Sequence, residues 1–175
     1  PVTIIASSMG GLFTTRYAAE HPERLNGMVI CSSFARFPQR LMINVGLVGS
    51  YFLPTRVLAS RSRVLVCGDR DKELGELFMR TVSAMSNRTV RNRYLILRNT
   101  RNQAVLQDIK GVPTLIMSGT LDEDVPAEHG KYLADHIDDA EYTLLEGAGH
   151  LGYFQQHDQF NGIVLDWLKT KGLLP

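Results

Sequence analysis

Four short apolar runs constrain the fold of this chain most strongly. Each is rich in Val, Ile, Leu or Met without polar alternation, as is typical of strands buried on both faces of a parallel sheet. Three of the runs are followed by segments whose apolar residues recur at helical spacing. Alternating strands and helices predict a parallel sheet with right-handed crossovers. The predicted strands are Val2–Ala6, Leu25–Ser32, Val112–Ser118 and Tyr142–Leu145.

The helices expected between these strands have recognisable starts and faces. One begins near Gly10 and closes before Pro22, and a second begins at Pro126. Pro is favoured in the first turn of a helix and tends to end the helix that precedes it. The last helix has an apolar stripe at i, i+3, i+4, i+7 and i+8, typical of a helix packed on one face. The stripe consists of Phe160, Ile163, Val164, Trp167 and Leu168.

Residues 34–110 interrupt this alternation. They read as mostly helical and carry fourteen Lys or Arg against five Asp or Glu, a surplus of nine positive charges in a chain whose net charge is +1. Such asymmetry indicates two structural units. We expect an α/β core from residues 1–33 and 111–175, with residues 34–110 inserted as a helical lid. Within the insertion, Leu41–Leu53 reads as a buried or lid helix, and Val64–Cys67 resembles the end of a strand.

The string Ala6-Ser7-Ser8-Met9-Gly10-Gly11 joins the first strand to the first helix. Small residues two before and two after Ser8 relieve the crowding of an abrupt strand-to-helix turn. Such a turn exposes the Ser8 hydroxyl at the edge of the sheet, and the backbone N–H of Met9 can face a developing oxyanion. The alternative is that Ser8 only caps the helix. Ser7 precedes the apex and is expected to be structural.

An acid and a base follow in the order that a serine nucleophile needs. Asp122 stands on the loop after the third strand, and His150 follows the glycine-rich segment after the fourth. Carboxyl ends of parallel strands share one edge of the sheet, where open α/β sheets place their sites. A serine hydroxyl needs a base within hydrogen-bond reach, and that base needs an acid to fix its tautomer. We therefore predict that Ser8, Asp122 and His150 converge.

Each assignment has an alternative reading. Asp71, after the strand-like Val64–Cys67 and within Gly68-Asp69-Arg70-Asp71, is the second choice for the acid, but no Val-Pro helix start follows it. Asp122 could be a helix-capping acid, although Asp124 lies nearer Pro126 and is the better candidate for that cap. His150 could be an ordinary loop histidine.

Three motifs together resemble the α/β-hydrolase superfamily. They are Ser-Met-Gly-Gly, the Gly-x-x-Asp-x-x-Val-Pro segment and Gly-x-Gly-His, and they span almost the whole chain. The resemblance implies a nucleophile, acid and base at Ser8, Asp122 and His150, an oxyanion donor at Met9, and hydrolysis of an ester or thioester without a metal or cofactor. Family members usually begin with further strands and an early loop that supplies a second oxyanion donor, and we expect both to be absent before Pro1.

The substrate and partners are less constrained. Phe34 and Leu151 are predicted substrate contacts, with core packing as the alternative for Phe34. No apolar run reaches the ~18 residues of a membrane span, and no nucleic-acid motif accompanies the arginines. Cys31 and Cys67 read as buried free thiols, which favours a reducing, cytoplasmic location. An unprotected edge on the first strand predicts self-association.

Two further classes of function remain as rivals. A catalytically incomplete chain could keep the fold as an interaction module. Alternatively, the basic insertion could bind anionic membrane surfaces.

Overall fold

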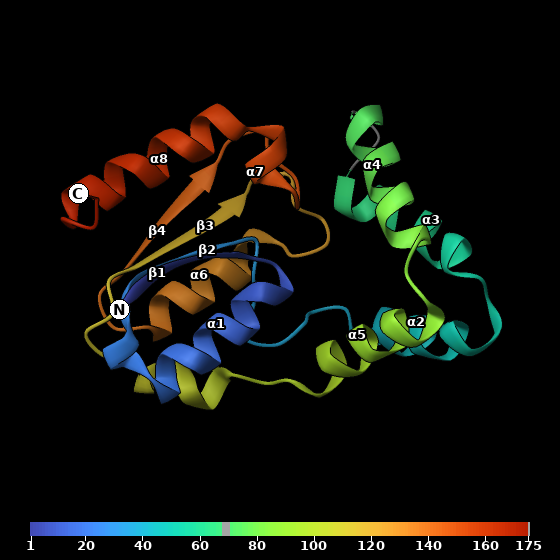
Figure 1. Cartoon of the computed structure of the whole chain (residues 1–175), viewed down its shortest axis with the longest axis horizontal. Coiled ribbons are helices and arrows are strands. Elements are labelled where there is room, and N and C mark those ends of the chain that lie inside the picture. Colours follow the sequence, from blue (N-terminus) through green and yellow to red (C-terminus); the bar gives the residue numbers. More distant parts are fainter. Residues whose placement is uncertain (68–70, 175) are drawn as a thin grey trace. The chain divides into compact units, whose positions relative to one another are not determined.

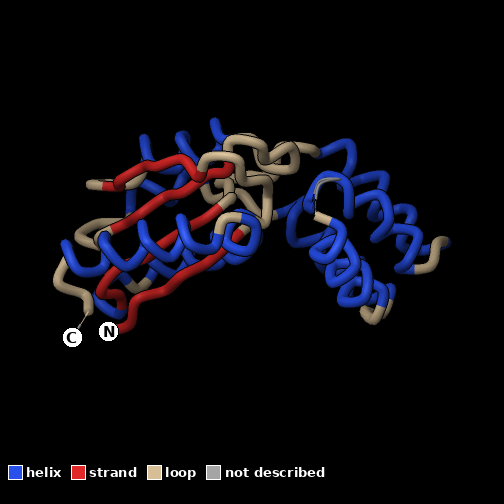
Figure 2. Tube along the Cα trace, turned by 90° about the horizontal axis from the view of Figure 1, so that it is seen from above, coloured by secondary structure: helices blue, strands red, loops and turns tan. Residues whose placement is uncertain are grey.

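The computed structural model describes residues 1–67 and 71–174. Four parallel strands form one sheet in chain order (Figures 1 and 2). Each of the four strands predicted for the α/β core is present, with ends shifted by two residues or fewer. The strands are β1 (Val2–Ser7), β2 (Leu25–Cys31), β3 (Thr114–Gly119) and β4 (Ala140–Leu145). The fold is therefore the predicted α/β arrangement with flanking helices.

Helices cover both faces of this sheet. Helices α1 (Met9–Glu20) and α6 (Ala127–His136) pack on one face with the 3₁₀ turn η2 (Gln103–Asp108), around a core that includes Met28 and Ile116. Helix α8 (His157–Thr170) covers the other face, where Trp167 packs against residues of β2 and β3. The short elements η1 (Pro22–Arg24) and α7 (Gly152–Gln155) complete this layer arrangement.

The register of the sheet determines where the candidate site lies. Ser7 pairs with Cys31, Cys31 pairs with Met117, and Gly119 pairs with Leu145, so the carboxyl ends of all four strands lie along one edge. The loops that leave β1, β3 and β4 therefore begin side by side. Strand β1 lies at one end of the described sheet, and self-association through it stays a prediction.

The described chain divides into two compact units, residues 1–36 with 101–175 and residues 37–100. Residues 101–110, which were expected in the insertion, belong to the first unit. Asn102 explains this placement, because its buried amide donates to the carbonyl of Leu12 (2.6 Å) and the hydroxyl of Thr15 (2.9 Å) in α1. Its backbone N–H donates to the carbonyl of Ala35 (2.8 Å).

The second unit is helical. Helix α2 (Arg40–Phe52) packs with α5 (Asn87–Asn99), and α3 (Thr55–Cys67) packs with α4 (Lys72–Ser83). The resemblance of Val64–Cys67 to the end of a strand is misleading, because these residues form the last turns of α3. A short β-branched run is compatible with either structure, and here helix packing decides. Residues 68–70 of the Gly68–Asp71 segment lie outside the described residues.

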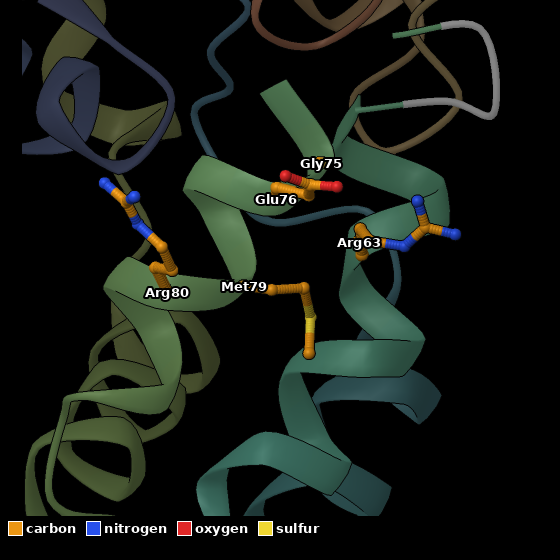
Figure 3. Close-up of a pocket in the computed structure, with 5 residues that line it drawn as sticks. All are labelled: Arg63, Gly75, Glu76, Met79 and Arg80. Carbon is orange, nitrogen blue, oxygen red and sulfur yellow. The ribbon is translucent and has the colours of Figure 1, made fainter. Parts of the chain in front are cut away.

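The second unit has an apolar stripe on one helix and a hollow between two others. Helix α2 buries Ile43 and Leu47 and exposes a stripe of Leu41, Val45, Val48 and Phe52. A hollow of about 420 Å³ lies between α3 and α4, where Met79 extends from α4 toward α3 (Figure 3). Its lining residues are Arg63, Gly75, Glu76, Met79 and Arg80. In the described part of the chain, none of the helices has both the length and the hydropathy needed to cross a bilayer.

Candidate active site

Ser8 lies at the apex of the turn between β1 and α1. Its backbone adopts φ 53° and ψ −125°, a left-handed conformation that L residues rarely hold unless their surroundings impose it. The Ser8 N–H donates to the carbonyl of Cys31 (2.9 Å), and the Ser8 carbonyl accepts from the N–H of Gly11 (3.0 Å). Its side chain makes no capping hydrogen bond. The helix-cap alternative for Ser8 is therefore wrong.

Asp122 lies on the loop after β3, and its side chain is fully buried. Its Oδ1 accepts from the backbone N–H groups of Asp124 (3.0 Å) and Val125 (2.8 Å), which fixes the carboxylate within its own loop. The prediction that Asp124 caps the next helix is wrong. Pro126 occupies the N-cap of α6, and no side chain caps that helix.

His150 connects the other two residues. Its Nδ1 lies 3.0 Å from Oδ2 and 3.2 Å from Oδ1 of Asp122, and its Nε2 lies 2.9 Å from Oγ of Ser8. An ionised carboxylate only accepts hydrogen bonds, so Nδ1 carries the proton and donates to Asp122. The unprotonated Nε2 then accepts from the Ser8 hydroxyl. The structure therefore brings all three predicted side chains together.

The loop that carries His150 packs closely against the loop that carries Asp122. The N–H of Leu121 donates to the carbonyl of Ala148 (2.8 Å), and Gly149 N–H donates to the side-chain oxygen of Gln155 (2.7 Å). A Cβ at Gly119 would collide with the carbonyl oxygens of Ala148 and Gly149. Glycine at position 119 thus permits the close approach that places His150 beside Asp122.

A second carboxylate approaches the imidazole. Oδ2 of Asp124 lies 3.7 Å from Nε2 of His150, and its side chain is 16% exposed. Burial alone would lower the pKa of His150, but the hydrogen bond and charge of Asp122, together with the charge of Asp124, outweigh it and raise that pKa. Burial also raises the pKa of Asp124, against the opposing effect of His150.

The remaining predicted residues lie as follows. Asp71 caps α4, where its Oδ1 accepts from the N–H of Leu74 (2.9 Å). Met9 is the first residue of α1, so its N–H needs no partner within the helix. Phe34 is fully buried, as the core-packing alternative expected, whereas Leu151 is partly exposed beside His150. Leu151 is thus the better placed of the two predicted substrate contacts.

Two residues near the nucleophile were missed in the sequence. The sequence marks Asp124 only as a candidate helix cap, although it lies two residues from Asp122 on the same loop. Ser33 was not singled out, but its hydroxyl donates to the carbonyl of Ser8 (2.7 Å). Its position just past the carboxyl end of β2 was an available signal, because that end borders the same edge of the sheet.

Residues 1–67 and 71–174 do not meet the requirements of a metal site. No group of three or more His, Cys, Asp or Glu side chains in that part of the chain has an arrangement that could hold a metal ion.

The buried thiol of Cys31 has its pKa raised to about 11, chiefly by burial, so it stays protonated at neutral pH.

Comparison with known proteins gives consistent results. A family model described as serine aminopeptidase, S33, matches residues 1–156. A 2-hydroxy-6-oxo-6-phenylhexa-2,4-dienoate hydrolase of Comamonas testosteroni is 27% identical over 184 residues, covering 96% of this chain and 63% of that protein. A pimeloyl-[acyl-carrier protein] methyl ester esterase of Neisseria meningitidis is 23% identical over 180 residues, covering 97% and 70%.

Solved structures share the fold. The enol-lactonase of Burkholderia xenovorans superimposes with a TM-score of 0.87 at 24% identity, over 94% of this chain and 64% of that one. The chain thus spans less than two thirds of the length of this structure and of the Comamonas hydrolase.

Proposed function

We propose that this chain, which belongs to the serine aminopeptidase S33 family of α/β-hydrolases, carries the active centre of a serine hydrolase that transfers acyl groups from esters or thioesters to water. The observation that carries the proposal is the continuous hydrogen-bonded path from Ser8 Oγ through the His150 imidazole to the buried Asp122 carboxylate. The path has the direction that nucleophile activation requires.

In the first half of the reaction, Ser8 Oγ attacks the substrate carbonyl carbon while its proton passes to Nε2 of His150. Asp122 stabilises the resulting imidazolium through the Nδ1 proton. The carbonyl oxygen becomes an oxyanion, and the backbone N–H of Met9 donates to it. The tetrahedral intermediate then breaks its bond to the leaving alcohol or thiol, which takes the proton from Nε2, and the acyl group remains on Ser8.

In the second half, water replaces the hydroxyl of Ser8 as the nucleophile. His150 takes a proton from the water, whose oxygen attacks the acyl carbon, and then returns that proton to Ser8 Oγ as the acid leaves. No step needs a redox or metal cofactor. Binding of the substrate falls in part to Leu151, and we assign the role of a lid to residues 37–100.

Several observations support an ester over an amide. An alcohol leaves a tetrahedral intermediate more easily than an amine does, so hydrolysis of an ester demands less of the acid that protonates the leaving group. The related Neisseria protein is named as a methyl ester esterase. The related Comamonas protein is named as a dienoate hydrolase, and that name does not describe an amide substrate either.

Labelling with a fluorophosphonate probe tests the proposal. The probe reacts only with an activated serine, so we expect one phosphonylated peptide, containing Ser8, in the mass spectrum of the digested chain. Labelling should disappear in Ser8→Ala and persist in Ser7→Ala, whose hydroxyl precedes the apex of the turn. A folded chain that takes up no label would favour the alternative, a non-catalytic protein that uses this fold as an interaction surface.

The pH dependence of the reaction should report the charge of Asp124. His150 acts as a base only when neutral, so activity rises as pH passes its pKa, which Asp122 and Asp124 raise. Asp124→Asn removes one of the charges that favour the imidazolium. The acid limb of the profile of log kcat/KM against pH should therefore move to lower pH. A matched exposed-site change, Glu128→Gln in α6, should leave the limb in place, and an unmoved limb in Asp124→Asn would contradict the assigned role.

A further inference from the structure

The end of β2 contacts the nucleophile turn on both sides of Ser8. The carbonyl of Cys31 accepts from the Ser8 N–H (2.9 Å), and the hydroxyl of Ser33 donates to the Ser8 carbonyl (2.7 Å). Between these two residues, Ser32 turns the chain with φ 49°, and its N–H donates to the carbonyl of Met117 (2.9 Å). The residues from Cys31 to Ser33 thus hold both peptide units of the nucleophile.

The Ser8 carbonyl and the Met9 N–H belong to the same planar peptide unit. Because that unit is rigid, a hydrogen bond that fixes the direction of its oxygen also fixes the direction of its N–H. Two donors fix the oxygen, the Ser33 hydroxyl and the Gly11 N–H. The unit follows a residue in a strained left-handed conformation, so without such support its orientation is free to relax.

The close packing of α1 on β2 is what lets Ser33 reach this carbonyl. A Cβ at Gly11 would collide with the hydroxyl of Ser33 and approach its Cβ to 2.6 Å and a methyl of Ile30 to 2.9 Å. Gly11 is therefore required by the contact with Ser33, and not only by the turn itself. Ser33 is 1% exposed, so water does not compete for its hydroxyl.

We propose that Ser33 is a positioning residue for the hydrolytic reaction: its hydroxyl orients the Ser8–Met9 peptide so that the Met9 N–H points at the oxyanion. The inference rests on the proposed function, since it assigns Met9 as the oxyanion donor. Ser33 touches neither substrate nor His150 in this assignment. Its effect is therefore confined to stabilisation of the developing negative charge, and the basicity of His150 is unaffected.

Ser33→Ala tests this role by removing the hydroxyl while leaving the backbone contacts of β2. We expect the second-order rate of fluorophosphonate labelling at Ser8, and kcat for a p-nitrophenyl ester, to fall about tenfold, the effect of one misdirected hydrogen bond at the oxyanion. Affinity for a phenylboronic acid, whose tetrahedral adduct places an oxygen at the same position, should fall in parallel. KM and the midpoint of the acid limb should stay unchanged.

The matched control is Ser118→Ala, an equally buried serine at 1% exposure on β3, a strand that is not adjacent to β1. It should label at the wild-type rate. Should Ser33→Ala fail to fold, Ser33→Cys decides, because its thiol occupies the position of the hydroxyl but is a weak donor. A reduced rate supports the role, and a wild-type rate overturns it.

The outcomes separate this inference from the proposed function. A wild-type chain that takes no label disproves the hydrolase itself. A wild-type chain that labels at Ser8, with a Ser33→Ala variant that labels within about twofold of it, overturns only the role of Ser33. A shift in the acid limb of the pH profile of Ser33→Ala also overturns it, because the substitution would then be acting on the pKa of His150.

Discussion

Replacing His150 by alanine is expected to lower kcat for ester hydrolysis by about 10⁶-fold, the effect of removing the base from a serine triad. The size follows from the geometry. Nε2 of His150 lies 2.9 Å from Ser8 Oγ. The Asp124 carboxylate lies 3.7 Å from Nε2, and a carboxylate is ordinarily a weaker base than imidazole. Without His150, the hydroxyl of Ser8 keeps its proton at neutral pH.

The measurement is the rate of p-nitrophenyl acetate hydrolysis together with labelling of Ser8. His157→Ala is the matched control, because His157 is exposed and its ion-pair partner Asp158 is exposed as well. That variant should keep the wild-type rate. Thermal unfolding of both variants must be followed, since alanine at position 150 leaves a small cavity. If a folded His150→Ala chain still hydrolysed the ester at the wild-type rate, His150 would not be the base of the reaction.

The sequence predicted the sheet and the convergence at its edge because both depend on local, repeated signals. Strands such as Val2–Ser7 and Thr114–Gly119 are marked by short apolar runs, and chain order then places Ser8, Asp122 and His150 at one edge. Burial on both faces holds for Thr114–Gly119, whereas Val2–Ser7 at the end of the sheet leaves Val2 and Ile5 exposed. The error at Val64–Cys67 has a physical reason. Its apolar, β-branched pattern is shared by strands and buried helices, and packing of α3 on α4 decided between them.

The contacts missed in the sequence depend on loop geometry that no periodicity encodes. Asp122 accepts the backbone N–H groups of Asp124 and Val125, and on the same loop the Asp124 carboxylate lies 3.7 Å from Nε2 of His150. Ser33 reaches Ser8 only because Ser32 adopts a left-handed conformation and Gly11 has no side chain. A left-handed serine has no strong sequence signal, since Gly, Asn and Asp are the residues that usually mark this conformation.

Replacing Asp122 by asparagine should lower kcat by about 10⁴-fold with little change in folding. The Oδ1 of asparagine can still accept the N–H groups of Asp124 and Val125, so the loop after β3 keeps its shape. The amide Nδ2, however, is a donor and faces Nδ1 of His150. The imidazole then prefers the tautomer with its proton on Nε2, which cannot accept the proton of Ser8.

The rival acid provides the matched control. Asp71→Asn makes the same chemical change at the N-cap of α4, where asparagine caps as well as aspartate and can accept from Leu74 N–H. Its kcat should equal that of the wild type. The wild type and both variants are compared by kcat for the p-nitrophenyl ester and by the imidazole ¹H resonances of His150, which report the tautomer. Activity retained in Asp122→Asn but lost in Asp71→Asn would transfer the acid role to Asp71, because only the true partner of His150 controls where its proton resides.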